Sequence, residues 1–210
     1  MIVPGSVFIP KTASGGDPYW GNVVLLMHMD DDFSDEKGHT TTVTGASISG
    51  GRGLFDGNDN VALEISSDFL TDTTEDFTFE FFVEFSDTSN RYFIGIVAYS
   101  SYFFSGSGAL SFTQTSSLTL AGVGDLTTGV RYHVAIARES GTLRGFIDGT
   151  MTSSSGGWNY VFGTESVAIT LGQLGVFNGL NGYLDNVRFT RGVARYTADF
   201  TVPSTPLPNS

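Results

Sequence analysis

The sequence predicts an all-β protein built as a two-sheet antiparallel sandwich, and three observations point to this fold. Glycine is abundant, with 27 residues scattered mostly beside Ser, Asn or Asp, which is typical of turns between short strands. No segment sustains the 3.6-residue periodicity of an amphipathic helix. About a dozen short β-rich segments at regular spacing favour two facing sheets within one domain.

The clearest strand is DFTFEFFVEF, residues Asp76–Phe85. Its side chains alternate strictly, and strict alternation is typical of a strand with one buried and one exposed face. The apolar face carries Phe77, Phe79, Phe81, Val83 and Phe85, and the other face carries Thr78, Glu80, Phe82 and Glu84. We therefore expect a half-buried strand with a phenylalanine-rich inner side.

The remaining strands follow from apolar or alternating runs bounded by turn residues. Asp148-Gly149 predicts a tight hairpin, because both residues tolerate the positive φ of a type I′ turn. Alternation breaks at Asp185-Asn186, which predicts a bulge that re-aims Asp185 towards a ligand. The predicted runs are Val23–Met29, Val61–Ile65, Tyr92–Ala98, Val130–Arg138, Leu143–Asp148, Val167–Leu171 and Gly182–Thr190.

The amino-acid composition limits how the core can be stabilised and which classes of partner the protein can bind. The 210 residues include 18 Phe and no Cys, so packing has to stabilise the core without disulfides or thiolate zinc sites. The net charge of −12 disfavours nucleic acid and anionic membranes as partners and suits a hard cation such as calcium. No apolar run approaches the roughly 20 residues that span a bilayer, and the N-terminus does not read as a signal peptide.

The two ends of the sequence differ in composition from its central part. Residues 1–17 contain Pro4, Pro10 and a Ser14-Gly15-Gly16 joint, and we interpret them as an N-terminal arm because several are apolar. A disordered terminus is the alternative. Residues 18–204 form the predicted domain, and residues 205–210 form an extended C-terminal tail.

Five segments, in order, resemble one family: WGNVVLLMHMD, GLFDGNDNVAL, DFTFEFFVEF, VRYHVAIARESGTLRGFIDG and GYLDNVRFTRGVARYTADFTVP. They look like the laminin G-like (concanavalin A-like) jelly-roll domain of bacteriophage virion proteins, and the closing segment is the most specific. The resemblance covers residues 18–204. It implies two curved antiparallel sheets that bind carbohydrate, protein or one another, often with calcium at one rim.

The resemblance also implies a structural calcium site between an acidic loop and the GYLDN segment. The matching positions are Asp30, Asp35, the carbonyl of Gly38, and Asp185. This loop reads DEKGHT where relatives often read DSSGN, so it departs from the family at Glu36–Lys37. The alternative is a solvated acidic loop that Lys37 neutralises.

Aromatic side chains beside flexible loops are candidates for stacking on sugars, because their faces match sugar C–H surfaces while their polar tips stay wet. Trp158 and Tyr160 follow a Ser/Gly-rich loop, and Tyr102 lies in a second aromatic segment. The alternative is that these side chains only cap an end of the sandwich.

The sequence predicts no enzyme and no catalytic residues. Glu80 and Glu84 share a face, but four residues of strand separate them by about 13 Å. Glycosidase carboxyl pairs lie roughly 5–9.5 Å apart. The close Glu-x-Asp-x-x-Glu pattern of this fold's glucanases is missing, and three histidines do not form a convincing acid–base set.

We expect a phage virion structural or accessory protein, such as a capsid decoration or tail-fibre component, located in the virion after assembly in the host cytoplasm. Its jelly roll would bind host-surface glycan or neighbouring virion subunits, and homo-oligomerisation stays open. A bacterial carbohydrate-binding module and a glycan-cleaving enzyme are the alternatives. We expect Arg188, Arg191 and Arg195 to pair with the acidic excess, the alternative being a contact with a partner subunit.

Overall fold

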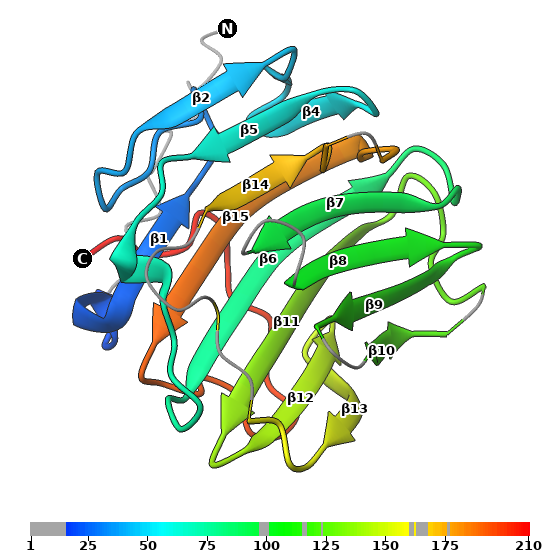
Figure 1. Ribbon diagram of the computed structural model, residues 1–210. Helices are drawn as coiled ribbons and strands as arrows, with labels where there is room; N and C mark the ends of the chain where they lie inside the picture. The colour runs from blue at the N-terminus through cyan, green and yellow to red at the C-terminus, as the bar shows by residue number, and fades with distance from the viewer. Residues whose placement is uncertain are drawn as a thin grey trace, which may run out of the picture.

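In the computed structural model two antiparallel β-sheets face each other as a sandwich (Figure 1). The structure describes residues 16–96, 101–114, 117–122, 124–159, 162, 168–175 and 177–210. Within these residues the helical segments are two short 3-10 turns, Trp20–Asn22 and Ser67–Phe69. No helix in the described part is long and apolar enough to cross a membrane. The predicted all-β sandwich is confirmed.

We call the sheet with β6 at its centre the back sheet, because it lies behind the other in Figure 1. Its strand order is β13-β12-β11-β6-β15-β4-β3, and β1 also pairs with β15. The strands are β1 (Val23–Met27), β3 (Ser47–Ile48), β4 (Gly53–Asp56), β6 (Phe77–Phe85), β11 (Arg131–Glu139), β12 (Thr142–Ile147), β13 (Thr150–Ser155) and β15 (Asn181–Arg191).

The other sheet, which we call the front sheet, has the order β10-β9-β8-β7-β14-β5-β2. Many neighbours in both sheets are distant in sequence, as the crossovers of a jelly roll require. The strands are β2 (Thr41–Thr44), β5 (Asn60–Leu63), β7 (Arg91–Ile96), β8 (Ser101–Gly106), β9 (Ala109–Thr113), β10 (Ser117–Ala121) and β14 (Ile169–Gly172).

Phenylalanines from both sheets form the core between them. Phe79 and Phe81 on β6 face Phe103 on β8, with ring-centroid distances of 5.7 and 4.9 Å. All three side chains are fully buried. The predicted alternation in β6 is therefore confirmed, because every second residue, usually a phenylalanine, points into the space between the sheets.

Local turn chemistry agrees with the sequence at two places. Asp148 and Gly149 have φ angles of 49° and 77° and join β12 to β13, so the predicted hairpin is confirmed. The pairing of β15 with β6 shifts register between Asp185 and Arg188, and Asn186 has a φ of 48°. The predicted bulge is therefore present.

The C-terminal segment adds a third layer that the strand pattern does not predict. Residues 192–210 pass behind the back sheet, as the red trace in Figure 1 shows. Tyr196 and Phe200 pack against Phe146 on β12. Leu207, in the predicted extended tail, is 1% exposed and packs against Val23 and Leu26 of β1. The tail is thus part of the packed body.

This layer corrects the description of β6 as half-buried. Glu80 is fully buried and Phe82 is 6% exposed, although both point away from the main core. Asp17, the last residue of the predicted arm, is also buried and donates its backbone N–H to the carbonyl of Ser210. Residues 1–15 of the predicted arm lie outside the described residues.

Candidate functional site

Four aromatic side chains gather on the outer side of the front sheet, and we call this surface the aromatic face. The ring of Tyr92 on β7 lies 5.4 Å from Tyr102, 4.8 Å from Phe104 and 4.8 Å from Phe177, measured between centroids. All four side chains are partly exposed, and Phe177 reaches 46%. The surface offers flat apolar rings together with the hydroxyl groups of two tyrosines.

Hydroxyl groups border the rings on the neighbouring strands. Tyr102 is in register with Thr113 on β9, and Phe104 is in register with Ser111. Thr113 Oγ1 lies 3.0 Å from Ser117 Oγ on β10. Directly opposed residues of a sheet present their side chains on one face, so the rings and hydroxyls share this surface.

Strand alternation directs the aromatic side chains outward. In β8, Ser101, Phe103 and Ser105 are buried, while Tyr102 and Phe104 between them are half-buried. The register of β7 against β8 shifts between Tyr92 and Ile94, and this irregularity leaves Tyr92 in the same row as Phe104.

Hydrogen bonds fix the end of β7 next to the aromatic face. Arg91 Nε donates to Asp87 Oδ1 at 3.1 Å, and its Nη2 donates to Oδ2 at 2.5 Å. Asn181 also donates to Asp87, at 2.8 Å. The hydrogen bonds from Arg91 hold the pKa of the Asp87 carboxyl well below its usual range. Tyr92 donates its backbone N–H to the carbonyl of Asn178, which anchors β7 to the segment after Phe177.

The three residues predicted to stack on sugar have different positions. Tyr102 lies on the aromatic face. Trp158 is only 2% exposed and packs 6.1 Å from Phe112 in the core, so the prediction that it stacks on a sugar is wrong. The Gly-rich loop before it lets the indole turn inward, where burial stabilises it. Tyr160 lies outside the described residues.

The structure does not assemble the predicted calcium ligands. Asp35 is buried and accepts hydrogen bonds from the backbone of Leu26 at 2.8 Å and from His39 Nδ1 at 2.6 Å. Asp185 pairs with Arg131 across the back sheet. The described residues contain no group of three or more His, Asp or Glu side chains that could hold a metal ion. Asp30 and Gly38 complete the predicted set, which does not fit an ion in this arrangement, so the predicted calcium binding is left to experiment.

A melting experiment tests that prediction directly. Asp35 and Asp185 already have protein partners, so we expect the same melting temperature in excess calcium and in excess chelator. An ion that binds only the folded state would raise the melting temperature with its concentration. A higher value in calcium would show that the acidic loop rearranges around an ion.

The polar side of β6 contains a buried ionic cluster, defined by Glu80, Arg188, Asp17, Arg195, His133 and Tyr196. Arg188 donates two hydrogen bonds to Glu80 Oε1, at 2.9 and 2.7 Å. Tyr196 donates to Glu80 Oε2 at 2.8 Å, and His133 Nε2 lies 3.1 Å from the same oxygen. Burial disfavours the charged carboxylate, but the hydrogen bond from His133 and the charge of Arg188 outweigh it and lower the pKa of Glu80 to about 2.

The three arginines near the C-terminus all pair with carboxylates, two of them inside this cluster. Arg188 and Arg195 both pair with Asp17, at 3.0 and 2.7 Å. Arg191 pairs with Glu75 at 2.9 Å. The prediction that these three arginines pair with the acidic excess is confirmed.

Sequence reasoning found one member of the aromatic face and missed three. Tyr92, Phe104 and Phe177 come from separate segments that only the sheet pairing brings together. A usable signal was present in β8, because strand alternation in SYFFSG puts Tyr102 and Phe104 on one side and the two serines with Phe103 on the other. Reading that alternation would have placed Phe104 on the same face as Tyr102.

Two comparisons with known proteins identify relatives of this fold. A laminin G family model (Laminin_G_3), described as the concanavalin A-like lectin/glucanases superfamily, matches residues 55–194. Domain 4 of AbnA, a GH43 extracellular arabinanase from Geobacillus stearothermophilus solved in complex with arabinotriose, aligns with a TM-score of 0.63 and 14% identity. That alignment covers 82% of this chain and 94% of the arabinanase domain. No curated protein matches the sequence.

Toxin binding domains share the same architecture. The binding domain of Paraclostridial Mosquitocidal Protein 1 aligns with a TM-score of 0.70 and 13% identity, over 85% of this chain and 50% of the toxin chain. The binding domain of Botulinum neurotoxin DC, solved in complex with rat synaptotagmin II, aligns with a TM-score of 0.63 and 14% identity. That alignment covers 82% of this chain and 48% of the neurotoxin chain. This chain therefore spans about half the length of those toxin domains, and the likeness extends to the fold.

Proposed function

The chain belongs to the concanavalin A-like lectin/glucanase superfamily through residues 55–194, and on this premise we propose that it is a non-catalytic carbohydrate-binding domain that uses the aromatic face. The observation that carries the proposal is the cluster of partly exposed rings around Tyr92, bordered by the hydroxyls of β9 and β10. A sugar presents C–H patches and hydroxyls in the same combination, so stacking and hydrogen bonding can act together.

Two structural relatives support a binding role. Domain 4 of the arabinanase was solved with arabinotriose, and the neurotoxin domain was solved with a protein, rat synaptotagmin II. Carbohydrate is favoured here because the aromatic face mixes rings with hydroxyls, whereas the core of a protein–protein interface is more uniformly apolar.

The carboxylates of the back sheet support binding without hydrolysis. Glu80 is fully buried and engaged by Arg188, His133 and Tyr196, so a substrate cannot reach it without removal of the C-terminal layer. Glu84 pairs with Arg52 at 2.6 Å. Neither carboxyl is arranged as a general acid with a nearby nucleophile.

We place this binding domain in a bacteriophage virion, on a tail or capsid surface. The support is the ordered resemblance of five segments across residues 18–204, including GYLDNVRFTRGVARY. Host-surface glycan is the expected partner on the aromatic face, and neighbouring virion subunits are the expected partners elsewhere. Detection of the protein in purified virions tests this context, and its absence there would leave a bacterial carbohydrate-binding module.

Replacing Tyr102 with alanine is expected to weaken glycan binding about tenfold, because loss of one stacking ring costs roughly 1.4 kcal/mol. The measurement is titration calorimetry with the tightest ligand from a glycan array that includes arabinotriose. The melting temperature should change little, since Tyr102 is half-buried on the sheet surface.

Tyr19→Ala is the matched control, because Tyr19 is also exposed (40%) but lies in the segment before β1 rather than on the front sheet. It should bind glycan like the unmodified protein. Equal losses for the two variants, or binding that survives Tyr102→Ala and Phe177→Ala together, would move the site away from the aromatic face.

A further inference from the structure

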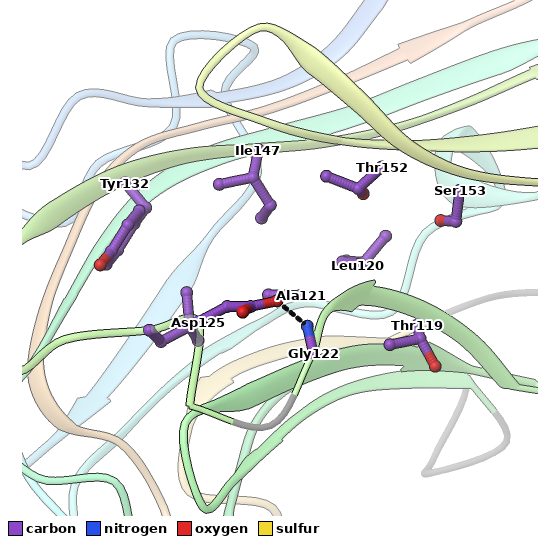
Figure 2. A pocket seen from close by; sticks show the side chains of 10 residues that line it. Thr119, Leu120, Ala121, Gly122, Asp125, Tyr132, Ile147, Thr152 and Ser153 are labelled. Atoms are coloured by element: carbon purple, nitrogen blue, oxygen red, sulfur yellow. Dashed lines mark hydrogen bonds between the residues drawn. The ribbon is translucent and has the colours of Figure 1, made fainter.

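A cavity of about 370 Å³ opens between the two sheets at the edge where β10 faces β12 and β13. Figure 2 shows it from close by, with Tyr132, Ile147 and Ser153 from the back sheet on one side and Leu120 and Asp125 on the other. Its size is within the usual range of small-molecule sites. It is separate from the aromatic face, which lies on the outer side of the front sheet.

Gly145 lets the two sheets meet at the end of this cavity. A Cβ atom at Gly145 would lie 2.2 Å from Leu120 Cδ2 and 2.8 Å from Ser153 Oγ. The missing side chain therefore lets Leu120 cross to the back sheet and brings Ser153 beside it. Tyr132, also in the lining, accepts a hydrogen bond from the backbone N–H of Thr127 at 2.9 Å, which holds its ring in place.

Ser153 brings an unsatisfied polar atom to the lining. Its Oγ is shielded from solvent and has no hydrogen-bond partner among the described residues. Buried hydroxyl groups are normally paired, because leaving one unpaired costs about 1–3 kcal/mol. The Oγ itself has no contact with solvent, so a ligand can bond it once a rotation about χ1 turns this unpaired hydroxyl into the cavity.

Asp125 supplies a carboxylate to the same cavity. Asp125 is exposed, and among the described residues its carboxylate accepts one hydrogen bond, from the backbone N–H of Gly122 at 2.5 Å (Figure 2, dashed line). A carboxylate has about four acceptor positions, so most of its capacity remains for a donor group. No Lys, Arg or His is among the described residues of the lining, so the cavity disfavours anions.

We propose that this cavity binds a small neutral or cationic molecule with an apolar ring and a hydrogen-bond donor. The ring packs against Leu120 and Ile147, and the donor group bonds the Asp125 carboxylate while Ser153 Oγ bonds a second polar atom. The proposal is independent of glycan binding, because it uses different residues and a different side of the front sheet.

Three probes with one ring system test the charge preference. 2-Naphthylethylamine, 2-naphthylethanol and 2-naphthylacetate are cationic, neutral and anionic, and their binding is measured by calorimetry on the full chain. We expect the amine to bind about tenfold more tightly than the alcohol, as a charged hydrogen bond to a carboxylate allows, and the acetate to bind most weakly. No binding by any probe, or tightest binding by the acetate, would overturn the proposal.

Variants then assign binding to the cavity. Asp125→Asn, which keeps an acceptor for Gly122, should reduce the advantage of the amine over the alcohol to below about threefold. The distant charge change Asp31→Asn should leave that advantage intact. Tyr102→Ala should leave all three affinities unchanged, and a loss there would mean that the probes stack on the aromatic face instead.

Ser153→Ala separates a ligand contact from a structural role. It removes a buried unpaired hydroxyl, so the melting temperature should stay the same or rise while probe affinity falls about fivefold. Ser154→Ala, on the exposed side of the same strand, should change neither value. If Ser153→Ala binds like Ser154→Ala, the hydroxyl does not contact the ligand and the proposed site is wrong.

Discussion

Glu80→Gln is expected to destabilise the protein by about 3–5 kcal/mol, the usual cost of breaking a buried ion pair from one side. Glutamine keeps the shape of the side chain but removes the charge that Arg188 and His133 face. Asp17 still pairs with Arg188, yet it also has to balance Arg195. The cluster is therefore left with excess positive charge under the C-terminal layer. Urea denaturation at neutral pH measures the loss.

Glu84→Gln is the matched control. It makes the same chemical change on the same strand, but Glu84 and Arg52 are about one-quarter exposed, at 22% and 26% of their side-chain surface. Partly exposed pairs contribute about 0–1 kcal/mol, so this variant should lose little stability. Similar losses for both variants would mean that the buried ionic cluster does not stabilise the fold.

The acid dependence of the same variant follows from the lowered pKa of Glu80. A carboxyl whose pKa falls on folding stabilises the native state above its unfolded pKa, and this contribution disappears as the pH falls through the folded value. For Glu80 the window runs from the ordinary value of 4.5 down to about 2. The stability difference between the native protein and Glu80→Gln should therefore shrink between pH 4.5 and pH 2. A difference that stays constant would show that Glu80 is not ionised in the folded state.

The burial of Glu80 shows which part of this fold the sequence could predict. Alternation in residues 76–85 correctly separates the phenylalanines from the polar residues, because the side-chain period of a strand is local. Alternation does not reveal what covers the second face. That depends on Tyr196 and Phe200, more than one hundred residues later in the chain, and their contacts with the back sheet come from tertiary packing.

The turns and side-chain directions considered for a site were also only partly predictable from the sequence. The Asp148-Gly149 hairpin and the Asp185-Asn186 bulge follow from local backbone preferences, so the sequence locates both. Local preferences do not determine the direction of the Trp158 side chain, since a Ser/Gly-rich flank is compatible with an indole that points outward or inward. The inter-sheet cavity depends on Leu120 of β10 packing against Gly145 of β12 in the opposite sheet, a contact that no local sequence pattern encodes.

Phe79→Ala is expected to cost about 3–5 kcal/mol, a large share of the 5–15 kcal/mol that stabilises a typical domain. Phe79 is fully buried, and its ring lies 5.7 Å from Phe103 across the sandwich and 5.6 Å from Phe189 on β15. Removing it leaves a cavity between β6, β8 and β15 that can close only if these paired strands shift towards one another. The fall in free energy of unfolding is measured by denaturant titration.

Phe104→Ala provides the contrast that links core and surface. Phe104 follows Phe103 on β8 but points to the aromatic face, where it is half-buried. It should lose less than about 1.5 kcal/mol of stability, because little apolar area leaves the interior. It should nevertheless weaken glycan binding, whereas Phe79→Ala should bind normally wherever it remains folded. A core phenylalanine would then contribute mainly to stability and a surface phenylalanine mainly to glycan binding. Equal stability losses for the two variants would contradict the assignment of Phe79 to the core and Phe104 to the aromatic face.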